Sequence, residues 1–163
     1  MNPELRPALA DDHEFLFLLY ASTRLHELAA LGWPAAQQEA FLRMQFKAQR
    51  QWYQTAYAAA EHQVIQIDGQ PIGRMIVLRE EKVWQLMDIS LLPETRGRGI
   101  GGELIRSLIQ ECAAAGAVLK LQVLKLNPAL RLYRRLGFTT AGEDQIYVQM
   151  ELHPSCAATR KSK

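Results

Sequence analysis

The first third of the chain carries hydrophobic residues at helical spacing. Residues 11–14 offer an N-cap followed by acidic residues, and an apolar run follows at 15–20, which predicts a first helix after a short strand near Leu5. Pro34 suits a first helical turn, and a second helix is predicted from there to about Tyr57. Its apolar residues recur every three or four positions, at Phe41, Met44, Ala48 and Trp52.

From His62 onward the spacing of hydrophobic residues changes from helical to extended. Residues 64–67 and 72–78 predict two antiparallel strands, residues 79–82 a polar turn, and residues 83–92 a third strand. Asp68 and Gly69 join the first two strands and are typical of a tight hairpin turn. Pro93 ends the third strand because it cannot continue a hydrogen-bonded ladder.

The second half of the chain alternates helices with strands. It predicts a helix over residues 100–113, a buried strand over 118–124, a short helix from Asn127 to Gly137 and a final strand over 146–152. Strands grouped with interleaved helices predict an α/β (α+β) sheet. We expect one domain over residues 1–152 and a flexible basic tail over residues 153–163.

The formal charge of +2 includes three positive residues at the extreme C-terminus, Arg160, Lys161 and Lys163. The rest of the chain is close to neutral, which argues against binding to nucleic acid or to a membrane surface. No apolar run is long enough to span a membrane, and no signal-peptide pattern precedes Asp11, so a cytoplasmic protein is expected.

Cysteine and histidine are too scattered to predict a metal site. Cys112 falls in a predicted helix, where we expect a core residue, and Cys156 falls in the tail. The four histidines include no pair at metal-ligand spacing. We therefore expect neither a metal nor a disulfide.

Chemistry enters at the loop after the third strand, which reads Arg96-Gly97-Arg98-Gly99-Ile100-Gly101-Gly102. A strand, a glycine loop and a helix in this order direct several backbone N–H groups and a helix N-terminus at one place, which favours a phosphate. A P-loop would require Lys and then Ser or Thr where Gly102 and Glu103 stand. The Rossmann fingerprint also fits poorly, because the preceding strand follows an antiparallel hairpin.

Two segments together resemble the GNAT superfamily of N-acetyltransferases. The fixed positions of that family's loop, Gln/Arg-x-x-Gly-x-Gly/Ala, are occupied by Arg96, Gly99 and Gly101. Residues 127–138 are similar to its Asn…Ala…Leu-Tyr…Gly-Phe segment, with the spacing from Asn127 to Tyr133 one residue shorter than is usual. The resemblance covers residues 62–152 well. It implies the GNAT fold, a mixed, mostly antiparallel central sheet that splays between the glycine-loop strand and the next strand, with helices on both faces.

The resemblance also implies how acetyl-coenzyme A is bound. Its pyrophosphate is held by the loop residues Arg96, Gly97, Arg98, Gly99, Ile100, Gly101 and Gly102. Its pantetheine pairs with main-chain groups near Ile89 and Leu91 and contacts Asn127. The Ile89 N–H is the implied oxyanion donor, and Tyr133 is the implied general acid for the departing thiolate.

The base and the acceptor site are less clearly indicated. Gln85 stands where some relatives carry a glutamate, which leaves Asp88, Glu27 or a water chain as the candidate base. The acceptor wall is predicted between the first two helices, where Arg24 suits a carboxylate, Glu27 an ammonium group and Trp33 an apolar side chain. This set suits a small-molecule amine, an amino acid or a peptide terminus.

The predicted function is direct transfer of an acetyl group from acetyl-CoA to a primary amine, without a covalent enzyme intermediate. An acyl-CoA-binding sensor without catalysis is the alternative, which Gln85 favours and Tyr133 opposes. Two further interpretations are a longer acyl donor and an arginine–glycine contact to nucleic acid. We expect a monomer or a homodimer, since the strand over residues 146–152 is predicted to be an exposed edge.

Overall fold

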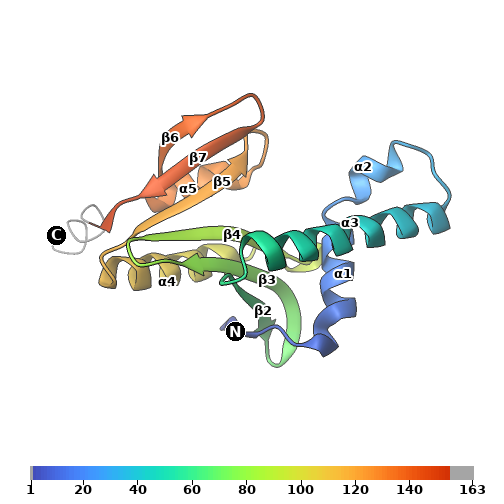
Figure 1. Cartoon of the computed structure of the whole chain (residues 1–163), viewed down its shortest axis with the longest axis horizontal. Helices are drawn as coiled ribbons and strands as arrows, with labels where there is room; N and C mark the ends of the chain where they lie inside the picture. The colour runs from blue at the N-terminus through green and yellow to red at the C-terminus, as the bar shows by residue number, and fades with distance from the viewer. Residues whose placement is uncertain (1, 155–163) are drawn as a thin grey trace. The chain divides into compact units, whose positions relative to one another are not determined.

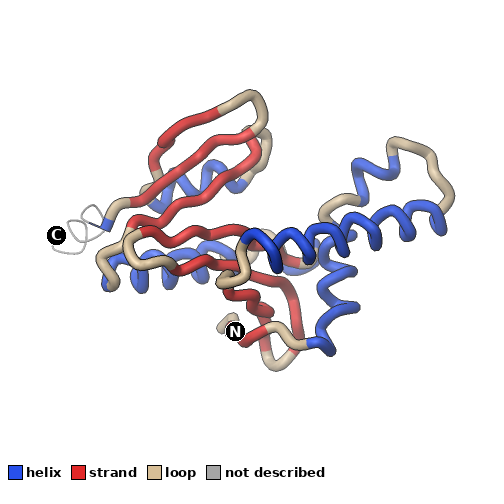
Figure 2. The backbone as a smooth tube through the Cα atoms, in the orientation of Figure 1, coloured by secondary structure: helices blue, strands red, loops and turns tan. Residues whose placement is uncertain are grey.

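The structure is a computed structural model that describes residues 2–154 (Figures 1 and 2). The described residues form two compact units, one made of the residues up to 75 together with 90–96, and the other of residues 76–89 together with those from 97 onward. In the first lie β1 (Glu4–Pro7), η1 (Ala10–Asp12), α1 (His13–Ser22), α2 (Leu25–Ala29), α3 (Ala35–Ala56), β2 (Glu61–Ile67) and η2 (Pro93–Thr95). In the second lie α4 (Ile100–Ala114), β5 (Val118–Leu124), α5 (Ala129–Leu136), β6 (Thr139–Glu143) and β7 (Tyr147–Leu152). Two strands contribute residues to both, β3 (Gln70–Arg79) and β4 (Val83–Leu91).

Seven strands are hydrogen-bonded in the order β1-β2-β3-β4-β5-β7-β6. β4 and β5 run parallel, whereas β1 with β2, β5 with β7, and β6 with β7 run antiparallel. This mixed sheet with interleaved helices confirms the predicted α/β (α+β) class. None of the helices within residues 2–154 combines the length and the apolar character that crossing a membrane requires. The predicted basic tail, with Cys156, lies outside the described residues from position 155 onward.

An apolar cluster from α1, α2 and α3 fills the core of the first unit. Its buried members are Phe17, Tyr20, Leu28, Leu42 and Phe46. The ring of Phe46 lies 5.8 Å from that of Phe17 and 5.4 Å from that of Tyr20, between centroids. The apolar spacing predicted α1 and α3 correctly. It did not predict α2, where the run Leu-His-Glu-Leu-Ala turns once and buries Leu28 in the cluster, so the predicted loop position of Glu27 is wrong.

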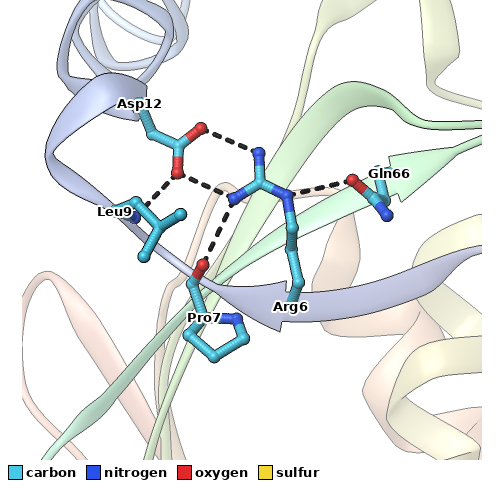
Figure 3. Close-up of polar contacts among 5 residues, drawn as sticks. All are labelled: Arg6, Pro7, Leu9, Asp12 and Gln66. Atoms are coloured by element: carbon cyan, nitrogen blue, oxygen red, sulfur yellow. Dashed lines mark hydrogen bonds and ion pairs between the residues drawn. The ribbon is translucent and has the colours of Figure 1, made fainter.

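Asp12 has a different role from the predicted helix cap. It precedes α1, but its carboxylate makes no cap hydrogen bond to that helix. Its oxygens accept hydrogen bonds of 2.8 Å from Arg6 Nη1, Arg6 Nη2 and the Leu9 N–H (Figure 3). Hydrogen bonding from Arg6 lowers the pKa of Asp12 to about 2, against the opposing effect of burial. The pair ties the end of β1 to η1.

The β2–β3 turn and Gly73 place different demands on the sequence. Asp68 and Gly69 have φ values of 51° and 77°, which confirms the predicted tight hairpin turn between β2 and β3. Gly73 lies in β3 against β4, and a Cβ there would collide with the carbonyl oxygen of Ser90. The first pair is needed for its backbone angles, and Gly73 for its lack of a side chain.

The second unit is built around β5, whose inward residues Leu119, Leu121 and Val123 are buried. α4 contributes a buried face to this unit, with Leu104, Ile105, Leu108 and Cys112. β5 pairs with β7 along the whole length from Leu119 opposite Leu152 to Leu124 opposite Tyr147.

β7 is also paired with β6 on its other side, so the prediction that the final strand is an exposed edge is wrong. The edge strand is β6, which the sequence pattern does not predict. Its sequence, Thr-Thr-Ala-Gly-Glu, is exposed over most of its length, contains a bulge between Thr140 and Gly142, and has no alternation of apolar and polar residues.

The parallel pair β4 and β5 separates partway along its length. Within the described chain, the pairing covers four positions, from Val83 opposite Val118 to Leu86 opposite Leu121. Both strands continue beyond it, β4 through Asp88 and Ile89 and β5 to Leu124. This is the predicted splay between the glycine-loop strand and the next strand.

Candidate active site

The glycine loop enters α4 through two residues with left-handed backbone. Gly97 and Gly99 have φ values of 75° and 79°, which side chains other than glycine rarely adopt. Gly99 is the N-cap of α4, and its carbonyl oxygen accepts the Glu103 N–H at 3.1 Å. The earlier N–H groups of the first turn lie at the positive end of the helix dipole.

The space over this loop is open. A Cβ built at Gly97, Gly99 or Gly101 would meet no heavy atom within 4 Å. Backbone can therefore approach an anion there without a side chain in the way, and Arg98 in the same loop is exposed. The loop residues fit the predicted pyrophosphate contact.

Arg96 and Leu91, two other predicted cofactor residues, are bound to each other. Arg96 Nε donates to the Leu91 carbonyl oxygen at 3.0 Å. Thr95 closes the same turn, because its hydroxyl and its N–H both donate to the Leu92 carbonyl oxygen, at 2.8 and 2.9 Å. The Arg96 side chain therefore braces the end of β4 in this structure.

The second motif folds as α5 with both ends capped. Pro128 holds the N-cap position, and the preceding Asn127 closes the turn, because its Oδ1 accepts the Ala129 N–H at 2.9 Å. Gly137 ends the helix with a φ of 108°, and the Phe138 N–H donates to the Tyr133 carbonyl oxygen at 3.1 Å. The Tyr133 ring is buried and lies edge-on to Phe138, 5.8 Å between centroids.

The second unit brings the two motifs together. A Cβ built at Gly102 would lie 3.5 Å from Leu132 Cδ1, so the first turn of α4 packs closely against α5. Asp88, in the part of β4 beyond its pairing with β5, lies close enough to act electrostatically on the next residue of α5, Tyr133. Ile89 follows Asp88 on the same strand and is half-buried.

The environment of Tyr133 keeps its hydroxyl protonated. Burial raises the pKa of Tyr133 to about 12, and the negative charge of Asp88 adds to that rise. The Cys112 thiol is in a similarly apolar position, where burial raises its pKa to about 11 and Sγ–H donates to the Ala117 carbonyl oxygen. Cys112 is the core residue that its position predicted and is poorly placed as a nucleophile.

The residues predicted for the acceptor wall all lie in the first unit, and two of them pack against its aromatic core. The Arg24 guanidinium carbon lies 4.5 Å from the centre of the Tyr20 ring, and Trp33 lies edge-on to Phe41, 5.3 Å between centroids. Glu27 is exposed on α2. No group of three or more His, Cys, Asp or Glu side chains within residues 2–154 is arranged to hold a metal ion.

A splayed parallel pair of strands, an open glycine loop and a buried tyrosine define the class of acyltransferases that bind coenzyme A at such a splay. The sequence profile of the acetyltransferase (GNAT) family matches residues 22–138, which include both motifs. The chain belongs to this family. The family transfers an acetyl group from acetyl-CoA, so the predicted enzyme class and co-substrate are confirmed.

Several solved structures share the fold of this chain. The PaiA N-acetyltransferase of Thermoplasma acidophilum, in complex with coenzyme A, is 18% identical, with a TM-score of 0.71 over 94% of this chain and 99% of that one. A chimera of the spermidine N-acetyltransferase SpeG of Vibrio cholerae and hSSAT is 19% identical, with a TM-score of 0.70 over 98% of this chain and 100% of that one. The Campylobacter jejuni N-acetyltransferase PseH, in complex with acetyl-CoA, is 19% identical, with a TM-score of 0.60 over 93% and 98%. No curated protein matches the sequence.

Proposed function

We propose that the protein is an N-acetyltransferase that moves the acetyl group of acetyl-CoA directly to a primary amine of a small molecule, an amino acid or a peptide. The observation that carries this proposal is the convergence of α4, α5 and the far part of β4 in one unit. The N–H groups of the loop, the protonated phenol and the strand backbone beyond the β4–β5 pairing can all take part in one reaction. A cytoplasmic location is part of the same proposal.

The donor is held mainly by backbone in this proposal. The N–H groups from Gly97 to Gly102 bind the pyrophosphate, and Arg98 adds positive charge. The side-chain oxygen of Asn127 is used by Ala129, so its amide N–H₂ is the half that meets pantetheine. The Ile89 N–H, beyond the paired part of β4, polarises the acetyl carbonyl as the oxyanion donor.

Tyr133 is the proposed acid, and its pKa limits how far it can transfer its proton. A free thiol has a pKa of about 8.5, well below the value of about 12 that burial gives Tyr133. Complete proton transfer to a thiolate is therefore uphill in the resting site. The phenol therefore contributes as a hydrogen-bond donor that stabilises the negative charge developing on sulfur in the transition state.

Asp88 is the carboxylate best supported as the base, because it interacts with Tyr133 in the same unit. Glu27 is the second candidate, on the exposed face of α2. Asp88→Asn and Glu27→Gln, made singly, distinguish them through the pH dependence of kcat/KM. The acidic limb of that profile disappears in the variant that lacks the base, and a limb unchanged in both variants rules out both carboxylates.

A sensor that binds acyl-CoA without catalysis is the second candidate, favoured by Gln85. This residue is half-buried in the paired part of β4, opposite Lys120, where its amide offers no useful base. Such a protein would bind acetyl-CoA and release no thiol with any amine.

The test is calorimetric titration with acetyl-CoA, followed by thiol release against a pool of amino acids, polyamines and peptides, with mass spectrometry of the products. Binding with thiol release and an acetylated amine supports the enzyme. Binding without release favours the sensor. Absence of binding contradicts both, and size exclusion with light scattering on the same sample decides between the proposed monomer and homodimer.

A further inference from the structure

A second site is indicated by a cavity of about 430 Å³ in the first unit. It is lined by residues of the β1–α1 connection, of α1, of α3 and the turn after it, and of β2 and β3. None of the residues assigned above to acetyl-CoA or to the amine lines it. Its volume is in the range of sites that hold small organic molecules.

The polar wall of this cavity carries positive charge. Arg50 and Arg74 line it, and no aspartate or glutamate is among the lining residues. Arg74 is buried, with 9% of its surface exposed, and its Nη2 donates to Gln49 Oε1 at 3.0 Å. Arg50 Nη1 lies 2.9 Å from His13 Nδ1, and because a guanidinium has no acceptor, this ring nitrogen is the acceptor of the contact.

The acidic side chains of α1 and its approach are bound elsewhere. Asp12 is held by Arg6 and the Leu9 N–H, as Figure 3 shows, and Glu14 Oε1 accepts from Arg43 Nη2 at 2.9 Å. Neither of them lines the cavity. Arg50 therefore lines the cavity with no carboxylate in the same wall.

The rest of the cavity wall is aromatic and apolar. Tyr53 is buried and lies edge-on to His62, 5.1 Å between ring centroids, and Tyr57 and Phe46 also line the cavity. A ligand that fits both parts joins an anionic group to a ring or a short apolar chain.

We propose that this cavity binds a small organic anion, in which a carboxylate or a phosphate group meets Arg50 and an aromatic ring packs against Tyr53 and Tyr57. The site is independent of the proposed acetyl transfer, since it shares no residue with it. Its occupant is recognised by charge and by ring stacking together.

The experiment titrates the full chain with benzoate, phenyl phosphate and the neutral benzyl alcohol, in saturating coenzyme A so that the glycine loop is filled. Binding is followed by calorimetry and by ligand-observed NMR. Benzoate or phenyl phosphate is expected to bind saturably, and the alcohol at least about tenfold more weakly. The stronger of the two anions identifies the group that the site takes.

Arg50→Gln is the matched test of the wall, because Arg50 is exposed on α3 and its loss leaves the core intact. Binding of the anion is expected to weaken about tenfold, with partial recovery in Arg50→Lys. The control is Lys47→Gln, which removes an exposed positive charge from the same helix outside the cavity. Three results each overturn the proposal: no saturable binding of either anion, equal binding of the alcohol, or equal losses in Arg50→Gln and Lys47→Gln.

Discussion

The glycine loop of the second unit and the cavity of the first unit are both suited to anions, but they are built in opposite ways. The loop is a short continuous segment in which Gly97, Gly99 and Gly101 face open space. The cavity gathers side chains from positions 8 to 74. The loop offers backbone N–H groups at a helix N-terminus, and the cavity offers the guanidinium groups of side chains.

This difference explains what each region tolerates. Adding a side chain to a backbone site blocks ligand binding but leaves the fold intact, because the protein has room for the added atoms. A side-chain site depends on the packing of the elements that carry it. Gly73, beside Arg74, is an example of such packing, because β4 leaves no room for a side chain there.

The largest effect is expected for Gly73→Ala, which tests the packed region. The new methyl group would overlap the Ser90 carbonyl oxygen, so the strands must move apart. We expect the free energy of unfolding to fall by about 3 kcal/mol, measured by urea denaturation. The control is Gly142→Ala in β6, where the nearest atom to the new Cβ is Gln149 Oε1 at 3.5 Å, an ordinary contact. Equal losses in the two variants would show that β3 and β4 can separate freely.

The second largest effect is expected for Tyr133→Phe, which tests the chemistry beside the loop. Removing the hydroxyl while keeping the ring should lower kcat by about 10- to 100-fold with little change in the Kd of acetyl-CoA. Because the pKa of Tyr133 is about 12, its ionisation should cause no loss of the wild-type rate below about pH 11. Tyr147→Phe, in β7, is the control and should keep full turnover. Equal turnover of wild type and Tyr133→Phe removes the phenol from the mechanism.

Much of the second unit could be predicted from the sequence, because its site is local. Gly99, Gly101 and Tyr133 belong to short segments whose spacing alone marks the loop and α5. Gly116 and Gly137 likewise mark the ends of α4 and α5, and the structure gives both of them positive φ values. Local rules of backbone geometry are visible in a sequence.

The cavity could not be predicted, because its groups are far apart in the sequence. His13, Arg50 and Arg74 each look like solvated surface residues, and only tertiary packing places them on one wall. Asp12 was misread for a related reason. Its position favours a helix cap. The guanidinium of Arg6, in β1, binds the carboxylate instead.

Asp12→Asn tests that ion pair, which joins the end of β1 to η1. The folded pKa of about 2 lies below the ordinary value of 3.8, so the charged carboxylate stabilises the fold above about pH 4 and this contribution is lost as the pH falls toward 2. We expect the variant to lose about 1–2 kcal/mol at pH 7, with a smaller difference from wild type at pH 3. Unfolding in urea at both pH values measures this. Asp11→Asn, at the neighbouring exposed position, should change little at either pH, and a gap that stays constant between the two pH values would contradict the role of the charge.

The smallest change in stability, and the sharpest contrast between fold and function, is expected for Gly101→Ala. Gly101 lies in the first turn of α4 with ordinary helical angles, and its new Cβ would meet no atom of the protein within 4 Å. Alanine should therefore raise the free energy of unfolding by about 0.5–1 kcal/mol through helix propensity. The same methyl group would stand over the backbone that we propose binds pyrophosphate, so the Kd of acetyl-CoA should rise several-fold.

Gly99→Ala separates these two effects, because its φ of 79° adds backbone strain to the same obstruction. It should weaken acetyl-CoA binding and also lower stability by about 1 kcal/mol. Chemical denaturation and calorimetry on the same preparations give both quantities. If Gly101→Ala bound acetyl-CoA as tightly as wild type, the anion would not lie on this backbone, and the loop would have to bind through the Arg98 side chain instead.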